Sequence, residues 1–260
     1  AGEHAHTGFP TGGLSLFRSQ GVLLSGQRSL GRDLVTSWEV GLWNGRNSRG
    51  LSNSDSKLLT SARVALFPFG QFDLTSQGDI ESEPRLRLAA LVSWYRDGGR
   101  HVRDAAGQQV TPYETRDQGS NLALLARLRG VSADLEWGRE RYDMRRSEPG
   151  EWEFERGGWR VALGWAVLPS RLEIVGRVAR LHRLRHPTRE AALRSGLGLA
   201  WIGSDGTYVS AVEASLSETT VGLNLYFGHA HQHKLFVDAS ALRRRFVDEG
   251  AGAPAVQSDR

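Results

Sequence analysis

The chain has 260 residues, no cysteine, and a formal net charge of +4 at pH 7. The lack of cysteine excludes disulfides, thiolate metal sites and thiol nucleophiles from its chemistry. Hydrophobic residues make up only 39%, and no stretch approaches the roughly 18 consecutive apolar residues that a transmembrane helix needs. The basic residues are scattered along the chain rather than clustered, so the sequence predicts no nucleic-acid partner.

Apolar residues alternate with polar ones through most of the chain, and this period of two indicates β-strands. In the segment 158–168, for example, Trp159 and Leu163 share one face, while Arg160 and Gly164 share the other. Most segments of this kind have close to the roughly 9–11 residues that a tilted strand needs to cross a bilayer. The pattern predicts an all-β, antiparallel transmembrane barrel with about ten strands present, over residues 20–30, 34–44, 58–67, 85–96, 120–129, 131–142, 158–168, 171–182, 218–228 and 233–246.

The predicted connections alternate in length, as expected when tight turns lie at one end of a barrel and long loops at the other. The long loops, rich in Gly, Ser, Asp and Arg, are 45–57, 97–119, 143–157 and 183–217. The turns are 31–33, 68–84, 129–130, 169–170 and 229–232, of which 68–84 is too long for a periplasmic turn. Two apolar alternating runs inside 183–217 suggest a hairpin that extends above the membrane, over residues 197–202 and 208–216.

The positions of charged residues along the apolar rows favour a membrane barrel over a soluble one. A cation costs about 2–4 kcal/mol at the bilayer midplane but only about 0–1 kcal/mol at the interface. On the apolar rows, arginines occur only at the strand ends that lead into long loops or the tail, at Arg139, Arg141, Arg180, Arg243 and Arg245. Tryptophan favours membrane interfaces, although the core of a soluble sandwich would also accept the five on these rows, Trp38, Trp94, Trp137, Trp159 and Trp165.

Several segments in order resemble the phosphate-selective porin O and P family. They are the runs WEVGLWNG at 38–45, ARVALFPF at 62–69, LPSRLEIVGR at 168–177, ETTVGLNLYF at 218–227 and KLFVD at 234–238. The resemblance implies a barrel of about sixteen strands, often trimeric, that passes phosphate, polyphosphate or other anions. The chain departs from the family at both ends: 1–19 is expected to be a loop, and 247–260 a loop-like tail before a closing strand that the sequence lacks.

The polar rows between 20 and 246 are the candidate pore lining, because selectivity in a pore depends on the charges that face its water. Arginine suits phosphate, since its planar fork binds two oxygens and stays charged. The predicted preference is therefore for small anions, although the same residues also suit cross-strand ion pairs. The predicted pore-lining residues are Arg63, Arg85, Arg87, Arg127, Arg160, Arg171, Arg177, Lys234, Glu173 and Asp238.

The five arginines at the ends of the apolar rows form a second candidate site, a basic belt. The loop-length argument places these ends in the outer leaflet of a bacterial outer membrane, where lipopolysaccharide carries phosphates. An arginine at that height can bind a phosphate while its stem lies along the hydrocarbon boundary. The competing interpretation is that Arg139, Arg141 and the others pair with nearby acids such as Glu140, Asp143 and Asp248.

Other functions have weaker support in the sequence. His229, His231 and His233 have a spacing that would allow a metal site on an extended segment, but a solvated turn is the simpler interpretation, so no metal is expected. No G-x-S-x-G or phosphate-binding loop indicates an enzyme or a cofactor site. The alternative to a pore is a structural or adhesive outer-membrane barrel with a plugged lumen and partner-binding loops.

Overall fold

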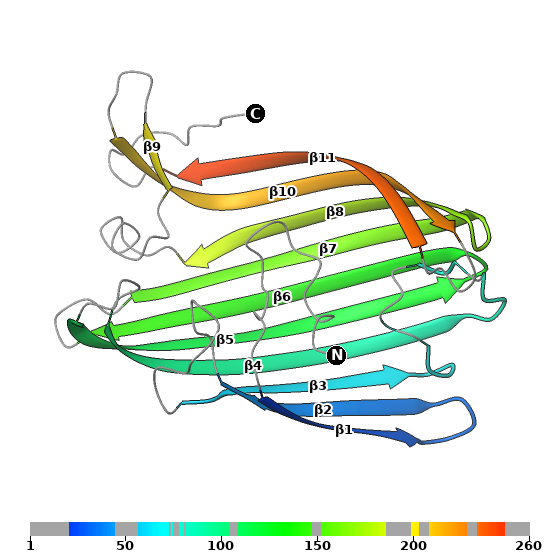
Figure 1. Ribbon diagram of the computed structural model, residues 1–260, viewed down its shortest axis with the longest axis horizontal. Coiled ribbons are helices and arrows are strands. Elements are labelled where there is room, and N and C mark those ends of the chain that lie inside the picture. Colours follow the sequence, from blue (N-terminus) through cyan, green and yellow to red (C-terminus); the bar gives the residue numbers. More distant parts are fainter. Residues whose placement is uncertain are drawn as a thin grey trace.

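The computed structural model is a single antiparallel β-sheet (Figure 1). It describes residues 21–44, 57–72, 74, 78–80, 82–103, 109–146, 152–185, 199–202, 208–227 and 233–247. Within these residues no helix is long and apolar enough to cross a membrane. The strands are β1 (Gly21–Ser29), β2 (Val35–Trp43), β3 (Leu59–Phe67), β4 (Arg87–Arg103), β5 (Gln109–Leu128), β6 (Val131–Arg146), β7 (Trp152–Leu168), β8 (Leu172–Arg185), β9 (Leu199–Ile202), β10 (Tyr208–Phe227) and β11 (His233–Val247).

Each strand of the main sheet pairs with its neighbours in the chain, in the order β1 to β8, then β10 and β11. This confirms the predicted all-β fold with ten antiparallel strands. The predicted hairpin within 183–217 is also present, because β9 pairs with the first part of β10 through the register Tyr208↔Ile202. Figure 1 places the short turns at one end of the sheet and the longer β4–β5 hairpin at the other.

The sheet is not closed into a barrel, which differs from the expected architecture. Among the described residues, β1 pairs only with β2 and β11 pairs only with β10. Each of these outer strands therefore has one edge without a β-partner there. An open edge presents unpaired main-chain groups, which proteins normally cover, pair or interrupt.

Two of the predicted long loops are largely strand. In the region 97–119, β4 continues to Arg103 and β5 begins at Gln109, and the two pair through His101↔Tyr113. In the region 143–157, β6 continues to Arg146 and β7 begins at Trp152. Strands β4 to β7 therefore extend well beyond the roughly 9–11 residues that a bilayer requires. The region 45–56 and the tail 248–260 lie outside the described residues.

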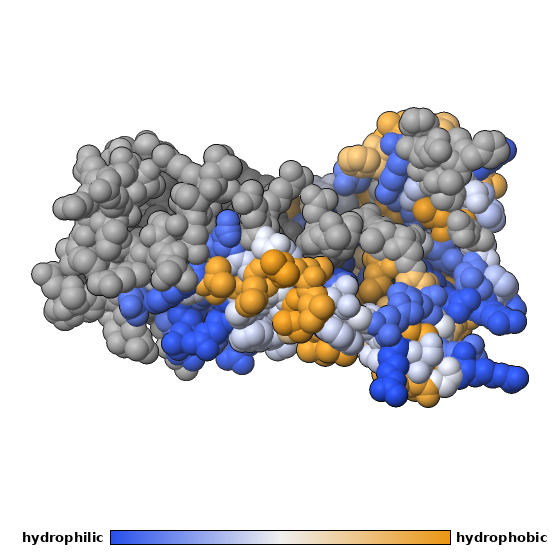
Figure 2. Space-filling view, turned by 60° about the horizontal axis from the view of Figure 1, so that its bottom comes forward, coloured by the Kyte–Doolittle hydropathy of each residue, from blue (hydrophilic) through white to orange (hydrophobic). Residues whose placement is uncertain are grey.

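One face of the sheet, the apolar face, is exposed although it carries large hydrophobic side chains. Leu163 is 57% exposed, Val221 is 61% exposed and Val92 is 56% exposed, and all three lie on internal strands. Figure 2 shows apolar side chains gathered in the middle of the visible surface, with hydrophilic residues toward both ends. A soluble monomer rarely exposes so large a continuous apolar surface.

The opposite face, the polar face, is largely buried and carries the charges. Arg127, Glu140, Glu173 and Glu218 are each less than 6% exposed. Hydrophobic packing on this face is confined mainly to the turn end, where a small core contains Ala65, Phe67 and Ala89. The polarity of the sheet is thus the reverse of a soluble barrel, which buries apolar residues and exposes charges.

Candidate functional site: the polar face of the sheet

The polar face surrounds a cavity of about 390 Å³ that extends from β3 to β11. Six of the predicted pore-lining residues line this cavity: Arg63, Arg127, Arg160, Arg177, Lys234 and Asp238. Period-two geometry accounts for their convergence, since alternate residues of neighbouring strands point to the same side. The cavity is lined by both charged and apolar side chains.

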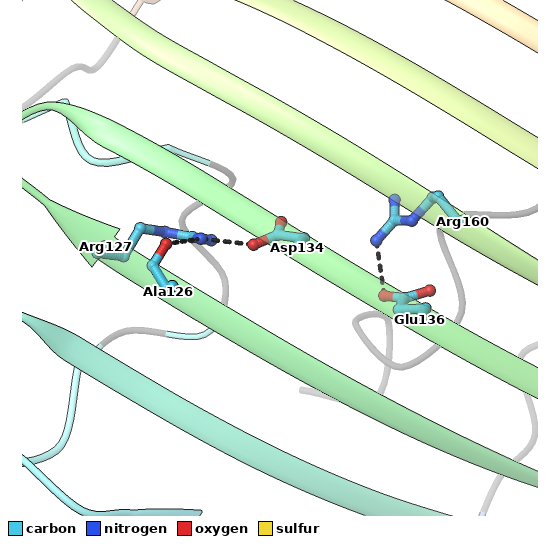
Figure 3. A network of polar contacts seen from close by, with 5 residues as sticks. All are labelled: Ala126, Arg127, Asp134, Glu136 and Arg160. Atoms are coloured by element: carbon cyan, nitrogen blue, oxygen red, sulfur yellow. Dashed lines mark hydrogen bonds and ion pairs between the residues drawn. The ribbon is translucent and has the colours of Figure 1, made fainter.

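Two ion pairs on this face join residues directly opposite one another on neighbouring strands. Glu39 of β2 faces Arg63 of β3, and their side chains meet at 2.5 Å. Glu136 of β6 faces Arg160 of β7, and the Arg160 Nη2 lies 2.6 Å from the Glu136 carboxylate (Figure 3). Both side chains of the second pair are at most 14% exposed, so this pair is well shielded from bulk solvent.

Two further ion pairs cross the sheet diagonally. Arg127 of β5 lies opposite Ser132 but reaches Asp134, at 2.5 Å, and it also donates to the Ala126 carbonyl oxygen at 2.9 Å (Figure 3). Arg177 of β8 likewise reaches Glu218 of β10. Together the four pairs form an inner charge ladder, defined as Glu39–Arg63, Arg127–Asp134, Glu136–Arg160 and Arg177–Glu218.

In and beside the inner charge ladder, more buried hydrogen-bond donors than acceptors lack a partner. Among the described residues, the buried atoms without a hydrogen-bond partner include Arg160 Nε, Arg177 Nε and Asn121 Nδ2, against one acceptor, Glu136 Oε2. All four residues line the cavity. Unused donors on permanently charged guanidinium groups suit the oxygens of an anion.

Carboxylates are as prominent on the polar face as guanidinium groups. Glu173 is 1% exposed, and its Oε2 accepts hydrogen bonds from Asn224 Nδ2 and from the Tyr226 hydroxyl, each at 2.9 Å. Toward the loop end, the Tyr95 hydroxyl lies 3.0 Å from Asp117 and 2.9 Å from Glu140. Acidic and basic groups are therefore both buried on the polar face of the described strands.

Four predicted pore-lining residues do not line the cavity: Arg85, Arg87, Arg171 and Glu173. Arg85 is exposed in the segment before β4, and Arg171 is exposed in the turn before β8. Arg87 begins β4, where its Nη1 donates to the Phe69 carbonyl oxygen at 2.7 Å. Turn residues do not follow strand alternation, which explains why period-two reasoning placed Arg85 and Arg171 on the lumen wall.

Several polar-face residues were missed because they lie in segments predicted as loops. Arg156 of β7 binds Glu140 of β6, and Asp117 of β5 is 4% exposed. Little in the sequence signals them, because 109–119 is polar on both faces and the apolar residues of 152–157 are out of phase with the row that begins at Trp159.

The five belt arginines all lie on the apolar face or its continuation, with exposed side chains. Arg139 binds Glu155, and Arg141 lies 3.0 Å from Asp143, an acid that the ion-pair interpretation named. The registers Arg180↔Ser217 and Ser217↔Arg243 place Arg180 and Arg243 at the same level on β8 and β11. A basic zone therefore crosses three strands beside the loop end of the sheet.

The described residues contain no group of three His, Asp or Glu side chains suited to a metal ion. The histidine run is not tested by this result, because His229 and His231 lie outside the described residues and the His233 side chain is not described.

No protein-family model, curated protein or solved structure matches the chain. The resemblance to phosphate-selective porins thus stays a prediction that depends on the quoted motifs alone.

The buried pair Glu136–Arg160 should be strongly coupled in stability. Removing one partner leaves a poorly solvated charge on the other. The stability lost in the double variant should therefore be smaller than the sum of the losses in Glu136→Gln and Arg160→Gln. We expect a coupling free energy of about 0.5–3 kcal/mol in a double-mutant cycle, measured by urea unfolding in detergent or lipid.

The exposed pair Arg141–Asp143 is the matched control, because its arginine side chain is 45% exposed. Its coupling should fall to about 0–1 kcal/mol. Equal coupling energies in the two cycles would show that the polar face is as well hydrated as the open surface, and would contradict the shielded inner charge ladder.

Proposed function

We propose that the chain forms the wall of a water-filled pore for small anions, such as phosphate, in a bacterial outer membrane. The observation that carries this proposal is the reversed polarity of the sheet, with Leu163 and Val221 exposed and Arg127 and Glu218 buried. Lipid on one side and water on the other favour that arrangement. An antiparallel sheet also pairs main-chain groups between strands, as a transmembrane segment requires.

Closure of the two outer edges is a physical requirement of this proposal. A spanning sheet must satisfy the main-chain groups of β1 and β11, either against each other or against further β-structure. The cavity along the polar face would then become the interior of a channel. Its charged lining is typical of wide barrels that enclose water.

The preference for anions is supported by the chemistry of the unused donors. Arg160, Arg177 and Asn121 all line the cavity, and each has a buried nitrogen donor without a hydrogen-bond partner among the described residues. Their carboxylate partners already accept hydrogen bonds from the same guanidinium groups through other nitrogen atoms. An anion that enters the cavity would use donors that the ion pairs leave over.

Reversal potentials in a salt gradient across a planar bilayer test this preference. The assembled protein should pass chloride more readily than potassium. Replacing Arg160 and Arg177 with glutamine should lower the chloride-to-potassium permeability ratio several-fold, because both unused Nε donors and two positive charges are lost.

The matched control replaces Arg139 and Arg141 with glutamine, since these arginines lie on the apolar face and should not affect the ratio. A channel that prefers potassium before any substitution would end the anion hypothesis. Loss of preference in the control variant would show that the charges act from outside the lumen.

A second function deserves consideration because of one observation. The segment between β3 and β4 contacts the polar face, and Leu74 of that segment lines the cavity. A lumen filled in this way would favour the alternative of a structural or adhesive barrel. Single-channel conductance separates the two functions, since a plugged barrel conducts little or no current.

We further propose that the belt arginines bind the phosphates of lipopolysaccharide. The position of these arginines supports the proposal, because Arg180, Arg243 and Arg245 are exposed on the apolar side at the loop end. The ion pairs of Arg139 with Glu155 and of Arg141 with Asp143 compete with this role. Phosphate binding and ion pairing therefore predict different consequences for the same substitutions.

Replacing all five belt arginines with glutamine should lower the thermal unfolding temperature in membranes that contain lipopolysaccharide and change it little in zwitterionic detergent. Conductance should stay nearly constant, because none of the five lines the cavity. Thermal unfolding followed by circular dichroism measures the effect. An equal loss of stability in both environments would favour ion pairing and contradict lipopolysaccharide binding.

A further inference from the structure

The connection between β3 and β4 is much longer than its hairpin needs. Leu66 lies opposite Ala90 in the paired register, so a two-residue turn after Phe67 would be sufficient. Instead the chain makes an excursion from residue 68 to residue 86. The described part of this excursion, residues 68–72, 74, 78–80 and 82–86, is here called the inner strap.

The first part of the inner strap packs on the polar face of β3, β4 and β5. Phe72 meets Phe67 edge to face, with ring centroids 5.9 Å apart, and the Arg127 guanidinium lies 5.8 Å from the Phe72 ring. Leu74 packs against the same small core and also lines the cavity. These side chains therefore lie over the polar face of the sheet rather than its apolar face.

The second part of the inner strap reaches β8, five strands from its origin. Gly78 lies against the Glu173 carboxylate so closely that any side chain at position 78 would collide with it. Neighbouring strands are about 4.8 Å apart, so the crossing covers roughly 24 Å. About eleven residues between Phe67 and Gly78 reach at most roughly 40 Å, which is enough for this crossing.

Hydrogen bonds then fix the inner strap to the turns of the sheet. Asp79 is 7% exposed, and its two oxygens accept from the Gly130 amide at 2.6 Å and the Glu83 amide at 3.0 Å. The Ser170 amide donates to the Ile80 carbonyl oxygen at 2.8 Å. The strap is thus bound to both the β5–β6 turn and the β7–β8 turn.

We infer that the inner strap narrows the turn end of the lumen and limits conductance through it, with Asp79 as the residue that positions it. This inference rests on the proposed pore function, because it concerns the width of that pore. Phe72 and Leu74 supply the obstructing bulk, while Asp79 and Glu173 hold the strap across the polar face. The other described turns at this end are tight, and none of them places a comparable obstruction in the lumen.

The direct test replaces residues 68–88 with Asn-Gly, which closes the β3–β4 hairpin between Phe67 and Ala89. Single-channel conductance of the reconstituted protein should rise several-fold. Asp79→Ala should give an intermediate increase or frequent transitions between current levels. Val221→Ala is the control, because this side chain is exposed on the apolar face and does not line the cavity, and it should leave the narrow conductance in place.

A second measurement keeps the inference testable if the shortened hairpin does not fold. The chain has no cysteine, so Leu74→Cys introduces a single thiol at the cavity. A bulky thiol reagent should then block most of the current, whereas Val221→Cys on the apolar face should be insensitive.

The outcomes separate the inference from the function on which it rests. If the protein conducts and neither the deletion nor thiol modification changes its current, the pore function stands and the inference that the inner strap limits conductance is wrong. If the protein conducts only after the deletion, the inner strap closes the lumen completely and the proposal of an open pore is wrong. A folded deletion variant that stays silent, like its parent, overturns both.

Discussion

The antiparallel register with its period of two is the constraint on which the rest of the structure depends. A slip of one residue between two strands would exchange the faces of every side chain beyond it. With the observed register, Glu136 meets Arg160 on one side while Leu135 and Val161 meet on the other. The same pairing therefore produces an apolar surface suited to lipid and a charged surface suited to water. A change of register would alter both surfaces together, because they alternate along the same strands.

The sequence predicted strands best where one face was apolar. Strand β3 was expected at 58–67 and occupies Leu59–Phe67, and β7 contains the whole of its predicted segment. The first part of β5, from Gln109, was missed because both of its faces are polar, so no contrast in hydrophobicity reveals the alternation. Strand β9 was found through its short apolar run. Hydrophobic contrast rather than strand propensity thus determined which elements were predictable.

The candidate site was predictable in its residue types and only partly in its contacts. Alternation placed Arg63, Arg160 and Arg177 on one face, and all three line the same cavity. Partner choice was not predictable, since Arg127 passes over the opposite residue, Ser132, to reach Asp134 diagonally. The contacts of Asp79 with Gly130 are also outside such reasoning, because they join positions 51 residues apart. Period-two patterns specify faces, whereas diagonal pairs and long-range contacts depend on the twist and curvature of the assembled sheet.

Contact between the apolar face and lipid is the central claim, and tryptophan fluorescence tests it most directly. Trp165 lies on the apolar face and is 55% exposed, while Trp43 lies on the polar face and donates to the Ser61 hydroxyl at 2.8 Å. Single-tryptophan variants that retain one or the other would be reconstituted in lipids brominated along their acyl chains, which quench indole fluorescence on contact. The fluorescence of Trp165 should fall strongly, and that of Trp43 should not change. Equal quenching of the two, or an unquenched Trp165, would contradict a membrane-facing sheet.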